Sequence, residues 1–473
     1  MLTTAVLCAS TLVRIRNLNY NAPFTDEAIY IVLGRMGLFD RDFAEYNPQS
    51  WVGGSVYLYP IISAAAANLG GVAGSRFINV VLSIFALEFT YLTAIRLAQN
   101  TRTDRFKAGL ISAVILGGSA TGYYVSRIAT HDMLSFLFFS MSLYYLVKAL
   151  QTPTPNARLY FASAMLMAGA FLIKTVILVY IPPVIAFTYL RVRKNRKHRI
   201  FGTGYLIIPL ALVTVGSLLI SREMLAAFIR GHVTITYDTL QNFREVIWGG
   251  FRYILPFALL GSAGLISDRK YSVFAVLAAG TLWIIIWHLA VSRVPALDKH
   301  LYLSVYFMAL IAGTGIPRLL KKLRPVKLKT SFYSALILIL AGYFVVSVNS
   351  AARLYDNYWY DSRPVLSYMT GVVKNGDKVL AETGAPVIYV TYEKNHPINT
   401  VTFDWFRYGN SEGTAAYAEA VRDGYFDIIE LESNSLPKLA EFSELHRRVA
   451  SIIPENYRLI YENRNFYVYR RLF

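Results

Sequence analysis

Charged residues and cysteine are both scarce in this chain of 473 residues. Charged side chains make up 16% of the sequence and hydrophobic ones 55%, whereas soluble domains average about 25% and roughly 45–50%. The single cysteine, Cys8, excludes intramolecular disulfides and metal sites built from cysteines. The sequence also has no glycine-rich phosphate-binding loop, so nucleotide binding has no support. These deficits exclude an ordinary soluble nucleotide-dependent enzyme, and an aromatic content of 14% excludes a disordered chain.

The net charge of +18 lies entirely within the apolar part of the chain. Residues 1–350 carry 33 Lys and Arg against 13 Asp and Glu, whereas residues 351–473 carry 14 against 16. A basic excess placed between apolar segments indicates membrane topology rather than a nucleic-acid-binding face. We therefore predict membrane lipids and no nucleic acid as partners, with 1–350 in the membrane and 351–473 as a soluble domain.

Apolar runs long enough to cross a bilayer follow one another through residues 1–350. A membrane-spanning helix needs about 20 apolar residues. The runs that qualify are 75–98, 107–126, 132–150, 200–220, 248–266, 271–291, 300–316 and 331–350. The run 158–191 is too long for one span, so we interpret it as two short spans that meet at Lys174. With the short first segment 1–13, the sequence predicts about 11 transmembrane helices.

Two strongly basic loops predict the orientation. Residues 191–199 and 318–329 each hold six Lys or Arg and no acid, and such loops mark the cytoplasmic side. Every basic loop is cytoplasmic if residues 55–70 form an interfacial or re-entrant helix rather than a span. Loop 14–74 and the domain 351–473 are then outside. We expect a multi-pass protein of the plasma or inner membrane whose chemistry lies on the outer face.

Two adjacent acids, Asp26 and Glu27, stand in the first external loop before an amphipathic stretch. One interpretation is local: Thr25 caps a helix, and acids in its first turn are favoured by the helix dipole. The other is that a carboxylate here acts in catalysis.

Further polar residues stand at the predicted outer ends of spans: Arg127, His131, Asp132, Lys174, Arg293, Lys299, His300 and Tyr302. Asp132 either caps its helix or faces a polar cavity, because an acid at the start of an apolar span is otherwise costly. The cations either snorkel toward lipid headgroups or bind an anion.

Taken in order along the chain, these features resemble the GT-C glycosyltransferases, in particular the protein O-mannosyltransferase and lipid A aminoarabinose transferase branch. The resemblance rests on segments 26–27, 57–60, 74–77, 127–132, 169–175 and 299–302. His131 and His300 depart from the pattern of that branch. The resemblance implies a polytopic α-helical membrane protein with a C-terminal extracytoplasmic α/β domain.

The same resemblance implies a hexosyl- or pentosyltransferase that moves a sugar, with inversion, from a polyprenyl-phosphate-linked donor to a lipid, glycan or protein acceptor. Asp26 is then the base, and Glu27 and Asp132 shape the site or hold a divalent cation, Mg²⁺ or Mn²⁺. Substrate binding falls to the polar residues at the helix ends: Arg127, His131, Lys174, Arg293, Lys299, His300 and Tyr302.

Two other function classes stay open. A transporter or flippase of lipid-linked sugars would use the same external cations, but it usually has internal repeats and ionisable residues at mid-membrane depth. A non-catalytic subunit of an envelope assembly would use residues 351–473 as its binding module, and the external acids argue against it.

Residues 351–473 have the pattern of a small α/β domain. We predict strands at 378–381 and 425–430, a helix over 413–422, and a hairpin of 457–461 and 466–469 around the turn at 463–465.

Overall fold

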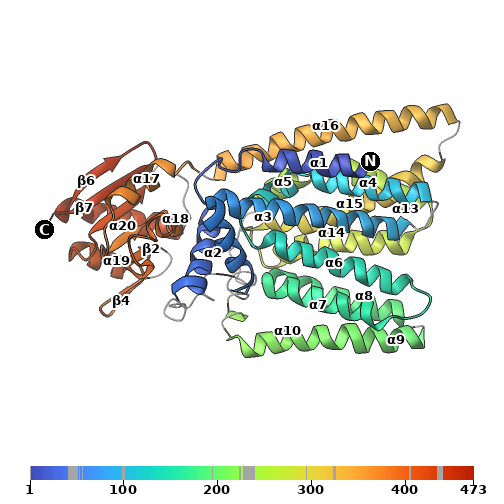
Figure 1. The fold of residues 1–473 in the computed structure, drawn as a ribbon, viewed down its shortest axis with the longest axis horizontal. Coiled ribbons are helices and arrows are strands. Elements are labelled where there is room, and N and C mark those ends of the chain that lie inside the picture. The colour runs from blue at the N-terminus through green and yellow to red at the C-terminus, as the bar shows by residue number, and fades with distance from the viewer. Residues whose placement is uncertain are drawn as a thin grey trace. The chain divides into compact units, whose positions relative to one another are not determined.

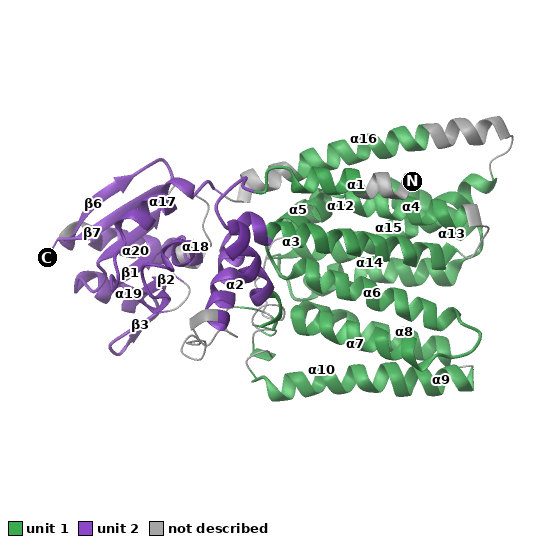
Figure 2. Cartoon of the chain, viewed as in Figure 1, with its two compact units in different colours: residues 1–18, 47–59, 76–355 green, residues 19–46, 60–75, 356–473 purple. Residues whose placement is uncertain are grey.

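The computed structural model describes residues 2–40, 52, 54–55, 57–98, 102–193, 195–222, 225–226, 229, 240–294, 296–322, 326–358, 360–403, 406–433 and 440–472. The chain divides into two units, coloured separately in Figure 2. Unit 1 comprises residues 1–18, 47–59 and 76–355, and unit 2 comprises residues 19–46, 60–75 and 356–473. Two segments of the predicted external loop 14–74 therefore group with the C-terminal domain.

Unit 1 is a bundle of helices (Figure 1). Its first half contains α1 (Leu2–Ile15), the second part of α3 (Leu58–Ala98), α4 (Arg102–Gly118), α5 (Ala120–Arg127), α6 (Asp132–Gln151), α7 (Ala157–Ile173), the 3₁₀ turn η4 (Thr175–Tyr180) and α8 (Ile181–Val192). Its second half contains α9 (Arg196–Gly202), the π-helical η5 (Thr203–Ile207), α10 (Ile208–Ile220), α12 (Leu240–Phe251), α13 (Leu255–Ser267), α14 (Tyr271–Ala290), α15 (Leu297–Lys322) and most of α16 (Val326–Tyr358).

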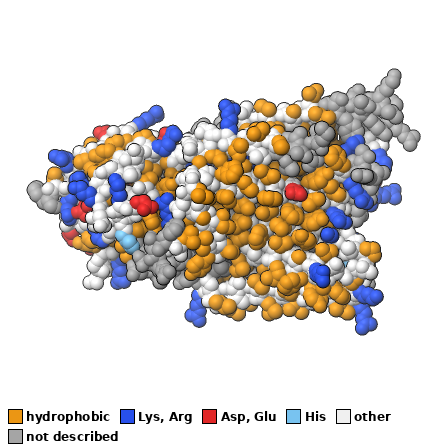
Figure 3. All heavy atoms as spheres, viewed as in Figure 1, with side chains coloured by type: hydrophobic (Ala, Val, Ile, Leu, Met, Phe, Trp, Pro, Cys, Tyr) orange, Lys and Arg blue, Asp and Glu red, His pale blue; other side chains and the backbone are white. Residues whose placement is uncertain are grey.

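Each apolar run predicted from the sequence is helical. Among the described residues, six helices are long and apolar enough to cross a membrane, or eight if each of two bent pairs is one span. That number is below the predicted 11 because α1, α7 and the apolar part of α16 (Ala335–Ala351) are shorter than a full span. Figure 3 shows the visible face of unit 1 covered by hydrophobic side chains, with Lys and Arg gathered mainly at the ends of the bundle. The chain is a polytopic helical membrane protein.

Two predicted breaks between helices are present. α7 ends at Ile173, and Lys174 is extended (φ −142°, ψ 115°) before η4 begins. Pro182 and Pro183 then stand in the first turn of α8, where a missing backbone N–H costs nothing.

α3 is interrupted at Gly70 and Gly71, and the positive φ of Gly71 (59°) is one that glycine adopts without strain. The predicted interfacial segment is thus distinct from the span that follows it.

Small residues let two helices of unit 1 approach closely. A side chain at Gly315 of α15 would place its Cβ 1.8 Å from the carbonyl oxygen of Gly261 in α13. Gly264 meets the Gly315 carbonyl in the same way, at 2.0 Å. Close approach through glycine is typical of helix pairs in membranes, where van der Waals packing drives association.

Unit 2 is built on a five-stranded sheet in the order β2-β1-β5-β7-β6. Its strands are β1 (Val379–Ala381), β2 (Thr400–Thr402), β5 (Ile428–Glu432), β6 (Tyr457–Glu462) and β7 (Phe466–Arg471), and β3 (Arg407–Tyr408) pairs with β4 (Ser411–Glu412) separately. β1 is parallel to β2 and β5, with Val379 opposite Thr400 and Ile428. β7 is antiparallel to β5 and β6.

The helices of unit 2 are α2 (Thr25–Arg35), η1 (Met36–Asp40), the first part of α3, α17 (Arg363–Val372), α18 (Ala385–Thr391), η7 (Pro397–Asn399), α19 (Gly413–Arg422) and α20 (Ala440–Asn456). Alternate strand residues pack on opposite faces of the sheet: Leu380 and Ile429 in one core, Val379 and Ile428 in the other. α2 lies against α18, where the Arg35 guanidinium stacks 5.1 Å from the ring centre of Tyr389.

The sequence predicted most elements of this domain correctly. The first strand, the helix 413–422 and the C-terminal hairpin are confirmed. The strand predicted to begin at Tyr425 begins instead at Ile428, because the preceding residues close α19. Gly424 has a positive φ of 65°, and the Tyr425 N–H donates to the Ala420 carbonyl at 2.9 Å, which is the pattern of a glycine-terminated helix.

Candidate active site

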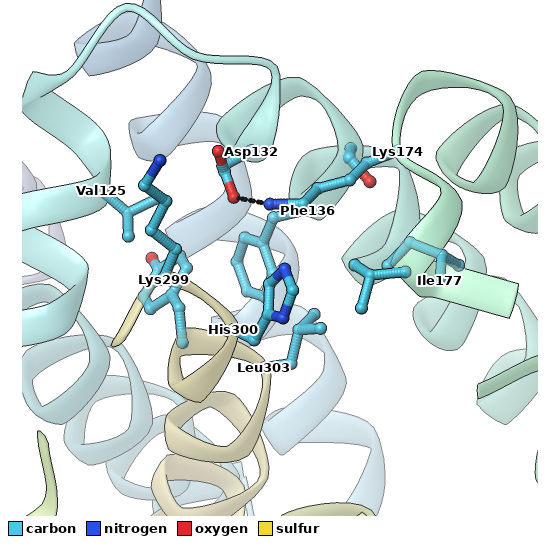
Figure 4. Close-up of a pocket in the computed structure, with 11 residues that line it drawn as sticks. Val125, Asp132, Phe136, Lys174, Ile177, Lys299, His300 and Leu303 are labelled. Carbon is cyan, nitrogen blue, oxygen red and sulfur yellow. Dashed lines mark hydrogen bonds and ion pairs between the residues drawn. The ribbon is translucent and has the colours of Figure 1, made fainter. Parts of the chain in front are cut away.

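A pocket lies in unit 1 where the start of α6, the break after α7 and the start of α15 meet (Figure 4). Its polar lining is formed by Asp132, Ser135, Lys174, Lys299, His300 and Tyr302, and the rest of its lining is apolar. Three helix termini thus bring together charged residues that are far apart in the sequence. Figure 4 shows Lys174 and Lys299 reaching toward Asp132 from opposite sides.

Asp132 is the first residue of α6, and each oxygen of its carboxylate accepts a hydrogen bond from a protein donor. The Lys174 ammonium donates to Oδ1, and the Thr130 hydroxyl donates to Oδ2 at 2.7 Å. The side chains of Asp132 and Lys174 are only 8% and 9% exposed. Asn79 of α3 donates to the carbonyl of Thr130 at 2.7 Å and so fixes the turn that precedes α6. Removing one partner of such a buried pair strongly destabilises the protein, because the other charge is left buried and unpaired.

The break after α7 positions the lysine. The last carbonyls of a helix have no partner within it, and here the Leu172 carbonyl accepts the backbone N–H of Ser55 at 2.6 Å. Gly54 passes so close to α7 that a Cβ there would lie 2.0 Å from the Ile173 carbonyl oxygen. The loop before α3 therefore packs on the turn that carries Lys174.

The first turn of α15 supplies Lys299, His300 and Tyr302. The Tyr302 ring packs on Phe136 of α6, with ring centres 4.4 Å apart. His300 is joined to a second histidine, because its Nδ1 lies 2.8 Å from Nε2 of His288 in α14. His288 Nδ1 in turn lies 2.6 Å from the carbonyl oxygen of Arg293.

The histidine pair has a defined hydrogen-bond direction. A carbonyl can only accept, so His288 Nδ1 must carry a proton and donate it to Arg293. Nε2 of the neutral His288 ring is then an acceptor, and His300 must donate from Nδ1. Neutral His300 therefore carries its lone pair on Nε2.

The charges of the pocket suit an anion. Two lysines stand against one aspartate, and Lys174 is the lysine paired with that aspartate. Lys299 adds a positive charge at the start of α15, with His300 beside it. A mostly apolar lining keeps the local dielectric low, which strengthens attraction for a negatively charged group.

Residues 60–220 match the family model described as dolichyl-phosphate-mannose-protein mannosyltransferase. Over this part, about a third of its length, the chain is similar to that mannosyltransferase family. No curated protein matches its sequence significantly.

Three solved structures share the fold of this chain at low sequence identity. ArnT from Cupriavidus metallidurans, bound to undecaprenyl phosphate, is 10% identical with a TM-score of 0.64 over 99% of this chain and 98% of its own. The mycobacterial arabinofuranosyltransferase AftD is 14% identical with a TM-score of 0.58, over 99% of this chain and 40% of its own. The Archaeoglobus fulgidus oligosaccharyltransferase, tethered to an acceptor peptide, is 10% identical with a TM-score of 0.56, over 100% and 74%.

The pocket gathers half of the predicted site residues: Asp132, Lys174, Lys299, His300 and Tyr302. Three others do not line it. Arg127 donates to the carbonyls of Arg16 and Asn17 at 2.7 and 2.8 Å, just past the end of α1, and its guanidinium stacks on the Tyr123 ring. His131 occupies the position before α6. Arg293 presents its carbonyl to His288.

Asp26 and Glu27, the two acids of the predicted external loop, lie in unit 2 and differ in environment. Glu27 is fully buried and accepts the Phe24 N–H at 2.8 Å, so it caps α2. The predicted cap at Thr25 is wrong: Thr25 is the first residue of α2, and Phe24 occupies the cap position. Asp26, next to Glu27, is half-buried.

A divalent cation at Asp132 stays a prediction. Both carboxylate oxygens accept hydrogen bonds, from Lys174 and Thr130, and the Lys174 ammonium lies beside Oδ1. Across the described ranges, no three His, Cys, Asp or Glu side chains form a group that could hold a metal ion.

Proposed function

We propose that this chain is a glycosyltransferase that moves a sugar from a polyprenyl-phosphate-linked donor to a lipid, glycan or protein acceptor on the outer face of the membrane. The family description names a dolichyl-phosphate sugar, and the similar ArnT structure holds undecaprenyl phosphate. The observation that carries the proposal is the pocket in which Lys299 and His300 meet the Asp132–Lys174 pair. A lipid-linked donor also agrees with the lack of a nucleotide-binding motif.

In this proposal the donor phosphate binds at the start of α15. Lys299 donates to the phosphate, while Lys174 is held by Asp132 and contributes mainly its field. When the bond between the anomeric carbon and the phosphate oxygen breaks, the phosphate leaves with the electron pair and gains a negative charge. Preorganised cations stabilise that charge as it develops.

Asp26 is the base in this proposal. It takes the proton of the acceptor hydroxyl as the acceptor oxygen attacks the anomeric carbon from the side opposite the phosphate, which inverts the configuration. Its half-buried side chain suits this role better than that of Glu27, whose carboxylate caps α2. General base catalysis contributes about 10²–10⁴-fold in rate.

Transfer of radiolabel from polyprenyl-phosphate-linked sugars by the purified chain tests the proposal. Asp26→Asn keeps the shape and is expected to lower turnover at least about 100-fold in a correctly inserted protein. Glu27→Gln, the neighbouring control, keeps an acceptor for the Phe24 N–H and should retain most activity. Full activity of Asp26→Asn with an inactive Glu27→Gln would move the base to Glu27, and no transfer by the wild type would refute the proposal.

The phosphate site has a separate test. Losing one charge-assisted hydrogen bond costs about 1.5–3 kcal/mol, so Lys299→Ala should weaken donor binding about ten- to hundredfold. Lys148→Ala, near the other end of α6, is the matched control and should leave binding unchanged. Unchanged donor binding in Lys299→Ala would mean that Lys299 merely snorkels toward the lipid headgroups.

The outward orientation of the active site and of unit 2 is part of the same proposal. With Cys8 replaced, a cysteine at Ser411 should react with an impermeant maleimide in intact cells, and one at Ser267, beside the basic residues Arg269 and Lys270, should not. The reverse pattern would overturn the orientation.

A further inference from the structure

One acidic side chain stands on the outer surface of the membrane bundle. Glu88 of α3 is exposed, and Figure 3 shows that acidic side chains are scarce on the hydrophobic face of unit 1. The aromatic residues that flank Glu88 around the helix contact two different helices. Phe89 packs on Tyr144 of α6 at 5.7 Å between ring centres, and Tyr91 packs on Phe106 of α4 at 6.4 Å. Glu88 points between these contacts, away from the bundle.

The periodicity of α3 confirms that direction. Phe77 and Phe85 lie on the same helical face as Glu88, and they are 47% and 50% exposed. The opposite face is buried, with Ala86 and Thr90 both at 0%. Glu88 therefore interrupts a lipid-facing apolar stripe.

The depth of Glu88 follows from its distance to the end of the helix. The exposed Arg96 is eight residues further along α3, just before the basic loop that we predict to be cytoplasmic. At a rise of about 1.5 Å per residue, Glu88 is roughly 12 Å from Arg96 along the helix axis. The hydrocarbon core is about 30 Å thick, so Glu88 lies near its middle if Arg96 marks the inner boundary.

A carboxylate is costly at that depth unless it is paired or faces the bundle interior. Within the described part of the chain, Glu88 has no ion pair and no hydrogen bond. Its position is also distinct from the pocket, because Glu88 is not among the pocket residues. Glu88 also differs from the polar residues at Asp132, Lys174 and Lys299, which stand at helix ends.

We propose that the outer face of α3 around Glu88 docks a transmembrane helix of a partner protein that carries Lys or Arg at mid-membrane depth. Charge complementarity selects this occupant, because a basic side chain would neutralise Glu88 inside the membrane. A second copy is the poorer fit. Residues 77–95 contain no Lys, Arg or His, so two copies of this face would set Glu88 against Glu88 or apolar residues.

Energy transfer in phosphatidylcholine vesicles tests the proposal, using the labelled full chain and a labelled polyleucine helix. One helix has Lys at its centre, and its matched control has Leu there. The wild type should bind the central-Lys helix about tenfold more tightly than the control. Glu88→Leu should lose this preference, and Glu88→Asp should retain part of it.

Three results would overturn the proposal. The first is equal binding of both helices by the wild type, and the second is an unchanged preference in Glu88→Leu. The third is self-association of the wild type that Glu88→Leu abolishes, which would make a second copy the occupant. Unchanged sugar transfer by Glu88→Leu would verify its folding, because Glu88 lies outside the pocket.

Discussion

Asp132 in unit 1 and Glu430 in unit 2 are both buried carboxylates, but only Asp132 has a lysine against it. Glu430 instead accepts the backbone N–H and the hydroxyl of Thr383, at 3.0 and 2.6 Å. Burial raises the pKa of Glu430 to about 8, and the neighbouring acids Glu432 and Glu382 add to the rise. Unit 1 thus retains a charge in its pocket, whereas unit 2 favours the neutral acid in its core.

This difference distinguishes a carboxylate of a functional site, Asp132, from a structural one, Glu430. A neutral Glu430 can form hydrogen bonds with Thr383. It thereby stabilises the pairing of β1 with β5 without needing a cation. A charged Asp132 needs Lys174, and the pair lies beside Lys299 in a pocket. Buried charges that are kept in clefts at such a cost are typical of functional sites.

Breaking the Asp132–Lys174 ion pair should have the largest effect on stability and transfer. Lys174→Met leaves Asp132 buried without its cation, which is expected to cost about 3–5 kcal/mol of stability and to abolish most transfer. Thermal unfolding in detergent measures the first effect and radiolabel transfer the second. Lys299→Met, which removes a pocket lysine outside the pair, should lower transfer without a comparable loss of stability.

The double variant sharpens this prediction. Lys174→Met with Asp132→Leu replaces the pair by apolar side chains and should recover most of the stability, because no lone charge is left buried. It should remain inactive. A Lys174→Met protein as stable as the wild type would show that the pair is not buried as described.

Glu430 should instead make the stability of unit 2 depend on pH. Between pH about 4.5 and about 8 the folded protein binds more protons at Glu430 than the unfolded chain does, so stability falls as pH rises through this range. Glu430→Gln can accept the Thr383 N–H and donate to its hydroxyl, and it should remove this slope. Hydrogen exchange of the β1 and β5 amides at pH 6 and pH 9, corrected for intrinsic rates, measures the difference. An equally steep slope in the variant would contradict it.

Much of this arrangement could be predicted from the sequence, and the part that could not has a physical reason. Lys174 at a helix break follows from a run too long for one span, and the hairpin around 463–465 follows from its turn residues. The partner of Lys174 could not be predicted, because pairing across α6 and α7 depends on how the helices pack. Glu27 and Arg127 were predicted as site residues from the resemblance, yet Glu27 accepts a backbone N–H, and Arg127 donates to backbone carbonyls and stacks on Tyr123. His288 was missed because a histidine in an apolar run has no local signal.

The histidine pair offers a smaller effect at the same pocket. His288→Leu removes the acceptor for the His300 Nδ1–H, and one net hydrogen bond of about 0.5–1.5 kcal/mol corresponds to roughly two- to tenfold in turnover. His288→Gln retains an acceptor and should recover most of the loss. Separate measurement of kcat and KM distinguishes positioning from packing. If Gln were as harmful as Leu, the ring would only fill space.

Removal of divalent cations should have the smallest effect on sugar transfer. It directly tests the contrast between Asp132, which has a lysine against it, and Glu430, which has none. Lys174 and Thr130 already occupy both oxygens of Asp132, so the charge that a divalent cation would supply at Asp132 comes from the lysine. Treatment with EDTA should therefore leave transfer within about twofold of the untreated rate, since no proposed step uses a metal. Glu430, which has no cation, gives no such site in unit 2 either. Activity that is lost with EDTA and restored by Mg²⁺ or Mn²⁺ would contradict this prediction and show that transfer requires a divalent cation.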